Sequence, residues 1–280
     1  NGVIVIQDST IHSYGQMGKI KIPKGADTVN LEGKWVIPGL IDAHIHFFQS
    51  GGLYTRPDII DLRHVVSYEK EMERVRGGVE DVFFRYIKCG VTGVLDMGGP
   101  HWNFDVRDKS YQNKLFPTTT VCGPLLSSYH PANLDENDKP IIKVNNFEEI
   151  DRELKKQLAA NTDFVKIWYI VRKGETPEMH LPLIKYIIDK SHEANKKVIV
   201  HATEHNTALA AVKAGADILA HSVDDALISP GLLKLLKEKK VIYVPTLIVS
   251  SRYEEVFSRQ LDLSSAELLL GDYKIIKSLR

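Results

Sequence analysis

Residues 196–222 read KKVIVHATEHNTALAAVKAGADILAHS, and this pattern sets the expected fold. A short β-branched run comes first, a segment of helical composition follows, and a second apolar run ends the stretch. Gly215 lies directly before the second run, where the C-cap residue of a helix is expected. The stretch therefore predicts two parallel strands joined by a crossover helix.

The same alternation extends over most of the chain, and Gly90 and Asn195 occupy further expected helix C-caps. Seven such units are too many for a small doubly wound domain and one short of eight, so we expect a TIM-like (β/α)8 barrel of the α/β class with the eighth strand missing. The expected strands are WVIPGLIDAHIHF (35–47), VTGVLDMGG (91–99), FPTTTVCG (116–123), TDFVKIWYI (162–170), KVIVHAT (197–203), ADILAHSV (216–223) and VIYVPTLIV (241–249), and the main helical stretches are 68–90, 147–161 and 179–197.

The two ends of the chain differ from this pattern. GVIVIQDSTIHSYG (2–15) predicts a β-hairpin turning at Asp8 and Ser9, and ADTVNLEGKWVIPG (26–39) predicts another strand. We assign residues 1–36 to part of a small β-sandwich and 37–280 to the barrel. The seventh strand should end near Val249 and a helix should span Ser264–Leu279. An open barrel leaves sheet edges unpaired, so we expect the barrel to be incomplete at its C-terminal side.

Composition excludes several classes of protein. Of 280 residues, 43% are hydrophobic and 26% charged, as in a soluble globular protein with a large core. The 36 basic residues match the 36 acidic ones, which gives no reason to expect nucleic acid or a membrane surface as partner. No run of 18 apolar residues predicts a membrane span. The cytoplasm is favoured, but the first residue lies inside a strand-like run, so we expect the N-terminus to be incomplete in this sequence and export stays open.

The cysteines do not form a disulfide framework. Cys89 and Cys122 each lie beside a hydrophobic run, so we expect both to be small core residues and not reactive thiols.

Histidines stand at the ends of three expected strands. His44 and His46 are two residues apart, so alternation along a strand turns both to one face. His201 and His221 end two further strands. A single histidine of this kind is more often bonded to a neighbouring carbonyl, but three strands ending in histidine favour convergence at the active face of a barrel. Imidazoles gathered in this way suit zinc and similar divalent ions.

Lys166 lies inside the strand-like run TDFVKIWYI. A parallel barrel strand is covered on both faces, so a charged amine there carries a large desolvation cost. One interpretation is a lysine that extends to the barrel mouth. The other is reaction with carbon dioxide to a carbamate, an anion that can bridge two divalent metals.

LEGKWVIPGLIDAHIHF (31–47) resembles the opening of the amidohydrolase superfamily, in which a small β layer leads into proline, glycine, two hydrophobic residues and D-x-H-x-H. HATEHNTALAAVKAGADILAHS (201–222) is similar to the imidazolonepropionase-like and Xaa-Pro dipeptidase-like branch. The resemblance covers the chain from Gly2 to about Val249, and the histidines and Lys166 follow the family's ligand order.

The resemblance implies a metal-dependent hydrolase that cleaves an amide-type C–N bond of a small-molecule substrate, such as a cyclic amide or an Xaa-Pro peptide. It implies one or two zinc ions, with His44 and His46 on the more buried metal, His201 and His221 on the second, and carboxylated Lys166 between them. The metals acidify a water that becomes the hydroxide nucleophile. The family's general base is an aspartate after the eighth strand, and we assign that role to no residue, which puts the activity of this 280-residue chain in question. Ester, lactone and phosphotriester substrates stay open.

Other polar residues follow the expected strands. We expect His101, His130, Tyr169 and Arg172 to bind substrate, with Arg172 meeting a carboxylate. The alternative for each is a solvated loop residue. The glycine-rich segment QSGGLYTRPD (49–58) predicts a binding loop. Asp42 is expected to support the metal site from outside its ligands, and Asp96 either does the same or is structural.

Two other functions compete with the amidohydrolase. HATEH (201–205) matches the H-x-x-E-H pattern of inverzincin metalloproteases, which requires both histidines on one helix face. The second is a metal-free scaffold of the same fold. The sequence leaves homo-oligomer formation open.

Overall fold

The computed structural model describes residues 2–134 and 137–280, and the chain divides into two compact units, Asn1–Pro38 and Gly39–Arg280. In the first unit β1 (Gly2–Gln7) and β2 (Thr10–Gln16) form an antiparallel hairpin whose turn holds Asp8 at a φ of 55°. The predicted hairpin is thus confirmed. The strand predicted over 26–39 is wrong: these residues have no strand structure, because a turn at Gly33, with a φ of 72°, interrupts the segment and Pro38 cannot donate a ladder hydrogen bond.

The second unit is a TIM-like α/β barrel that is not closed. Two parallel sheets, ordered β3-β4-β5 and β11-β10-β9-β8-β6-β7, are joined by a parallel bridge between Cys122 and Phe164. Each of the seven predicted strands is present, although the seventh ends at Val244, before Pro245, and not near Val249. The strands of the predicted series are β3 (Leu40–Ile45), β4 (Val91–Asp96), β5 (Thr118–Val121), β8 (Val165–Trp168), β9 (Val198–His201), β10 (Ile218–Ala220) and β11 (Ile242–Val244).

Two short strands were not predicted. β6 (Leu125–Ser127) and β7 (Ile141–Lys143) pair in parallel after β5, and β6 also pairs with β8. Three residues are too few to show the alternation by which strands are found in a sequence.

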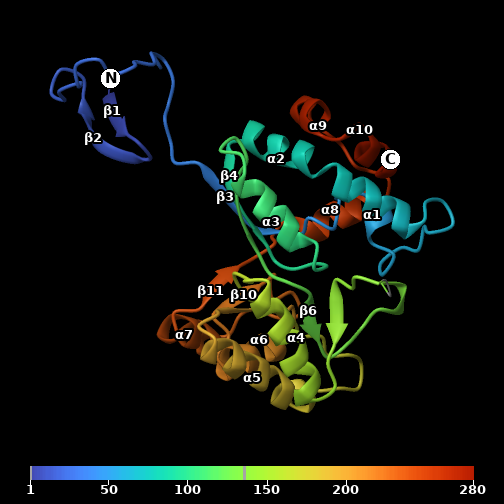
Figure 1. Ribbon diagram of the computed structural model, residues 1–280. Coiled ribbons are helices and arrows are strands. Elements are labelled where there is room, and N and C mark those ends of the chain that lie inside the picture. Colours follow the sequence, from blue (N-terminus) through green and yellow to red (C-terminus); the bar gives the residue numbers. More distant parts are fainter. Residues whose placement is uncertain (1, 135–136) are drawn as a thin grey trace. The chain divides into compact units, whose positions relative to one another are not determined.

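Helices surround the barrel strands, and α4, α5 and α6 lie side by side (Figure 1). The predicted C-caps are confirmed by positive φ angles at Gly90, Asn195 and Gly215. The stretch 68–90 forms two helices that meet at Gly78, and the helix predicted over Ser264–Leu279 is also two, separated at Gly271 and Asp272. The helices are α1 (Tyr68–Gly77), α2 (Val79–Lys88), α3 (Asn103–Tyr111), α4 (Phe147–Ala159), α5 (Pro177–Glu193), α6 (His205–Ala214), α7 (Pro230–Glu238), α8 (Val249–Phe257), α9 (Ser265–Leu270) and α10 (Tyr273–Ser278), with 3-10 turns η1 (Leu53–Thr55) and η2 (Ala132–Leu134).

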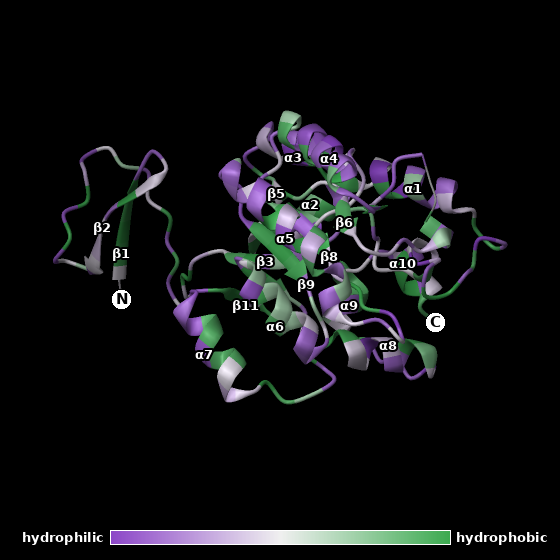
Figure 2. Ribbon diagram, turned by 90° about the horizontal axis from the view of Figure 1, so that it is seen from below, coloured by the Kyte–Doolittle hydropathy of each residue, from purple (hydrophilic) through white to green (hydrophobic). Residues whose placement is uncertain are grey.

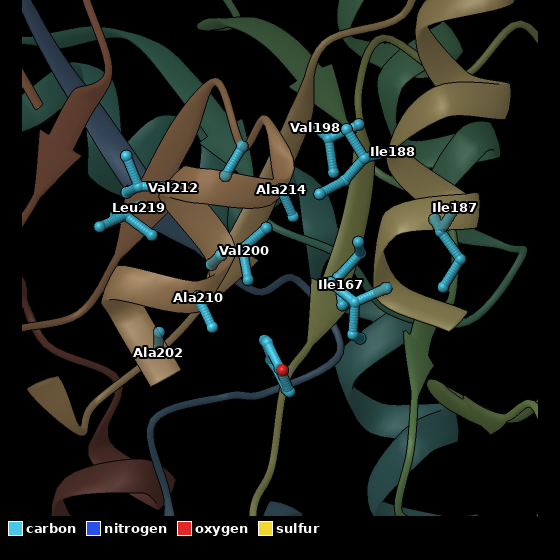
Figure 3. Packing of buried hydrophobic residues seen from close by; sticks show 14 of the residues in the cluster. Ile167, Ile187, Ile188, Val198, Val200, Ala202, Ala210, Val212, Ala214 and Leu219 are labelled. Carbon is cyan, nitrogen blue, oxygen red and sulfur yellow. The ribbon is translucent and has the colours of Figure 1, made fainter. Parts of the chain in front are cut away.

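The largest core cluster lies between the strands and the helices that cover them. Ile167, Val198 and Val200 pack against Ile187 and Ile188 of α5 and against the alanine-rich face of α6 (Figure 3). In Figure 2 the helices show mixed hydrophilic and hydrophobic residues, as expected for one buried face. This packing holds β8, β9 and β10 in place, so that their carboxyl ends meet at one mouth. None of the helices in the described ranges combines the length and apolar character needed to cross a membrane.

Candidate metal centre

Four histidine rings meet at the carboxyl ends of three strands. The ring centroids of His44 and His46 lie 5.3 Å apart, those of His44 and His221 4.5 Å, and those of His201 and His221 4.3 Å. The structure therefore brings together the four histidines singled out in the sequence.

The strands place these rings by simple register. His201 is the last residue of β9 and pairs with Ala220 at the end of β10, so His221 follows directly beside it. His221 has a φ of 76°, a left-handed conformation that is uncommon outside glycine and is found more often at functional sites. Its backbone N–H donates to Val244 of β11 at 3.0 Å, which holds this turn against the neighbouring strand.

Lys166 lies in the middle of β8 and is 1% exposed. Its Nζ donates to Met97 Sδ at 3.5 Å, and in the described part of the chain it has no ion-pair partner. Burial lowers the pKa of the amine to about 8. A buried cation facing a thioether and several imidazoles is unfavourable, so this position favours a neutral or modified amine.

The four imidazoles are held in their neutral form. Desolvation and then the charge of Lys166 lower the pKa of His46 and of His221 to about 3 each. Desolvation is also the largest cause that lowers the pKa of His44 and of His201. His46 Nδ1 donates to the Gly98 carbonyl at 2.7 Å, which leaves its Nε2 with a free lone pair. A neutral imidazole with a fixed tautomer has a lone pair that can coordinate a metal ion.

The donor set fits a divalent ion, although it is not a closed ligand sphere. His44 Nδ1 is buried without a hydrogen-bond partner, the condition expected of an atom that awaits a ligand. Among the described residues, however, no three His, Cys, Asp or Glu side chains are already arranged around one metal-sized point.

A cavity of about 720 Å³ opens over the cluster. It is lined by all five predicted metal ligands and by Gln49, Ser50, Gly51, Arg56 and Asp58 of the predicted binding loop. Sequence reasoning missed Trp168, Thr246 and Tyr253 in this lining. Trp168 is two residues after Lys166 on the same strand, so alternation alone would have placed it on the same face. Thr246 and Tyr253 follow β11, and no short motif marks them.

Asp96 and Asp42 hydrogen-bond backbone groups next to the predicted ligands, and Asp42 also lines the cavity. Fully buried Asp96 accepts hydrogen bonds from the backbone N–H of Phe47 at 2.9 Å and of Gly98 at 2.8 Å, and from Asn103 Nδ2 at 2.8 Å. Burial raises the pKa of this carboxyl to about 7 even though the three donors favour its charged form. Asp42 Oδ1 accepts from the backbone N–H of His44 at 3.1 Å.

The four residues expected to bind substrate do not line this cavity. Tyr169 is fully buried in the core under the helices, where its hydroxyl donates to the Pro177 carbonyl. It lies next to Trp168, and a one-residue step along a strand reverses the face. Arg172 is exposed and pairs with Glu175 at 2.6 Å.

The two other residues expected to bind substrate, His101 and His130, each make a hydrogen bond with another residue. The backbone N–H of His101 donates to Asp138 at 2.9 Å, and its ring lies 6.1 Å from that of Phe104. His130 Nδ1 donates to the Ile141 carbonyl at 3.2 Å. Neither residue lines the cavity.

The H-x-x-E-H alternative lacks its required geometry. His201 is in β9, whereas His205 begins α6 and its Nε2 contacts Ser229 Oγ at 2.9 Å. The two histidines therefore do not share a helix face. The prediction for the cysteines is half wrong: Cys122 is buried, but Cys89 ends α2, is exposed and lies at the cavity.

Fold and site together define an α/β-barrel protein with a histidine-rich mouth. A family model described as the amidohydrolase family matches residues 35–269, and the chain belongs to this family. The match confirms the resemblance seen in the sequence.

Individual relatives agree with this assignment. The chain is 38% identical to an imidazolonepropionase of Mesorhizobium japonicum over 55 residues, which are 20% of this chain and 13% of that protein. A solved amidohydrolase superposes with a TM-score of 0.67 at 19% identity over 98% of this chain and 68% of that one. A prolidase complexed with N-methylphosphonate-L-proline superposes with a TM-score of 0.65 at 18% identity, over 99% of this chain and 66% of the prolidase. The structural likenesses show the fold, and the chain spans only a part of these proteins.

Proposed function

We propose that this chain carries the metal-binding part of a hydrolase that cleaves an amide-type C–N bond. The single observation that carries the proposal is the meeting of four neutral histidines with buried Lys166 at one open cavity on the carboxyl face of the barrel. Family membership supports it, since amide hydrolysis is the chemistry named in the family and in its imidazolonepropionase and prolidase relatives.

The histidines would hold one or two divalent ions, and zinc suits an all-imidazole set. His44 and His46 would bind the inner position, and His201 and His221 the outer one. When loaded, such a site supplies Lewis acidity that polarises a carbonyl and acidifies water. The chain's own part is to keep these imidazoles unprotonated and oriented, as the His46–Gly98 hydrogen bond does.

Lys166 is proposed to be carboxylated. The amine nitrogen forms a bond to the carbon of carbon dioxide, a proton leaves to solvent, and the product is an anionic carbamate. This would replace a buried cation that lacks an anionic partner in the described residues by an anion facing cations. The general base is not assigned to any residue of this chain.

The substrate is proposed to be a cyclic amide or a small peptide such as an Xaa-Pro dipeptide. The name of the imidazolonepropionase supports the first and that of the prolidase the second. The cavity of about 720 Å³ is large enough for either.

The described histidines do not form a complete ligand set, and this favours one alternative, a scaffold of this fold that binds no metal. The metal content of the chain distinguishes the hydrolase from the scaffold. After dialysis against zinc, we expect the chain to retain zinc, His46→Asn and Lys166→Met to lose at least one equivalent per chain, and His205→Asn to retain it. Elemental analysis by mass spectrometry gives the stoichiometry, and ¹³C NMR in labelled bicarbonate detects the carbamate.

A chain that retains no zinc would refute the hydrolase and support the scaffold. Loss of zinc in His205→Asn with retention in His46→Asn would instead support the H-x-x-E-H site. Circular dichroism of each variant shows whether it is folded.

A further inference from the structure

A second cavity, of about 440 Å³, adjoins the histidine cavity. One wall is the loop after β3, with Leu53, Ile59 and Ile60, and the other is α8, with Val256 and Phe257. Aliphatic and aromatic side chains form most of the lining. Its polar lining residues include Arg252 and Glu267, which form an ion pair at 3.6 Å. We call this space the apolar cavity.

The two cavities are adjacent and share part of their lining. Gln49, Gly51, Arg56, Val249 and Tyr253 line both, and we call these five residues the junction. A small molecule bound at the histidines would therefore lie next to the apolar cavity, with only the junction residues between the two spaces. The volume and character of this space match those of small-molecule subsites, which are mainly apolar with a few placed polar groups.

Two polar residues of the junction, Arg56 and Tyr253, are hydrogen-bonded to each other. Arg56 Nε and Nη2 donate to the Asp58 carboxylate at 3.0 and 2.9 Å, and Arg56 Nη1 donates to the Tyr253 hydroxyl at 2.7 Å. The Tyr253 oxygen accepts from a charged donor, which orients the hydroxyl and strengthens it as a donor. In the described ranges the Tyr253 proton has no acceptor, so it is available to an oxygen at the junction.

We propose that the substrate carries a bulky aliphatic or aromatic group beside its scissile amide, that this group occupies the apolar cavity, and that Tyr253 donates to a substrate oxygen at the junction. The proposal rests on the proposed function for the location of the scissile bond. It adds the substrate class and two specificity-determining elements, α8 and Tyr253, to the site.

The test is a binding series with N-acetylglycinamide, N-acetylleucinamide and N-acetylphenylalaninamide, measured by calorimetry on the zinc-treated 280-residue chain. Affinity should rise from glycine to phenylalanine by about fourfold per buried methylene equivalent. Val256→Trp, which fills the apolar cavity, should remove this rise. Glu254→Trp is the matched control, since Glu254 is exposed on the same helix and lines neither cavity, and it should keep the rise.

Two more variants complete the test. Val256→Asp puts a charge into the cavity without adding volume, so it gives the same answer if Val256→Trp does not fold. Tyr253→Phe should weaken all three ligands by a similar factor of about five, the loss of one hydrogen bond. A flat series, or a preserved rise in a folded Val256→Trp or Val256→Asp chain, overturns the apolar subsite.

Zinc content measured on the same samples separates the two proposals. Normal zinc with a flat series refutes the apolar subsite alone. A rising series in a chain without zinc refutes the metal-dependent hydrolase and leaves the cavity as a binding site.

Discussion

At the scale of single residues, Asp96 connects the end of β3, where His44 and His46 lie, to the loop after β4. Its carboxylate accepts from the backbone N–H of Phe47, which follows His46, and from that of Gly98, whose carbonyl accepts from the His46 ring. Asp96 therefore acts on His46 through the backbone and is a positioning residue. Its pattern in the sequence, an aspartate at a strand end, left a structural and a supporting role open and did not predict its three donors.

Replacing Asp96 by Asn should disturb this arrangement, because the amide nitrogen of Asn cannot accept from the surrounding N–H groups. We expect zinc affinity to fall by about 10- to 100-fold, and the free energy of unfolding to fall by about 2 kcal/mol. Zinc competition with a chelating dye and urea unfolding measure the two. Asp163→Asn is the control, since Asp163 accepts from the Val121 backbone N–H at 2.9 Å near the start of β8.

That control should lose stability and keep zinc affinity. Equal zinc affinity in Asp96→Asn and the unchanged chain would show that Asp96 has only a structural role.

At the scale of elements, regular patterns with clear ends could be predicted and contacts distant in sequence could not. Strand-end histidines and the C-caps at Gly90 and Gly215 were found because local alternation and backbone conformation determine them. The break between α1 and α2 was missed because Gly77 and Gly78 lie inside an otherwise continuous helical pattern. Arg56 and Tyr253, two of the five junction residues, are almost two hundred residues apart, and only the fold brings them together.

Gly215 provides a test of helix termination. Its φ of 112° is unfavourable for any residue with a side chain, and a Cβ there would lie 3.3 Å from Ile188 Cγ2. We expect Gly215→Ala to lower the free energy of unfolding by more than about 1 kcal/mol. In Gly77→Ala, the control, a Cβ meets nothing within 4 Å and the residue is helical, so stability should stay equal or rise by up to about 1 kcal/mol.

Urea unfolding compares the two variants. A Gly215→Ala chain as stable as Gly77→Ala would mean that α6 ends without needing the left-handed conformation.

At the scale of the whole molecule, the neutral histidines connect stability to pH. Their pKa values lie below the ordinary 6.5 in the folded chain, so below this pH the unfolded chain binds more protons than the folded one. Their contribution is present above pH 6.5 and is lost as the pH falls toward about 3. Asp96 opposes this, because its raised pKa favours the folded chain at low pH and this contribution is lost as the pH rises to about 7.

The effect of the four histidines on stability exceeds the opposite effect of the one carboxyl. The free energy of unfolding of the chelator-treated chain should therefore fall as the pH is lowered from 6.5 to 4.5. Each histidine contributes about 1.4 kcal/mol per pH unit, and His46→Asn should make the slope shallower by about that amount. Urea unfolding at stepped pH measures the slope. An identical slope in His46→Asn would show that His46 is already protonated in the folded chain at these pH values.

The barrel's open sides have a consequence for handling the protein. Among the described residues β3 and β11 each pair with a single strand, and Ile41 of β3 is 73% exposed. Backbone amides and carbonyls beside bare hydrocarbon form a template onto which an extended segment of another molecule can add. Concentrated solutions should therefore become turbid well below the melting temperature, by aggregation that begins at these edges while the core under α5 and α6 is still folded.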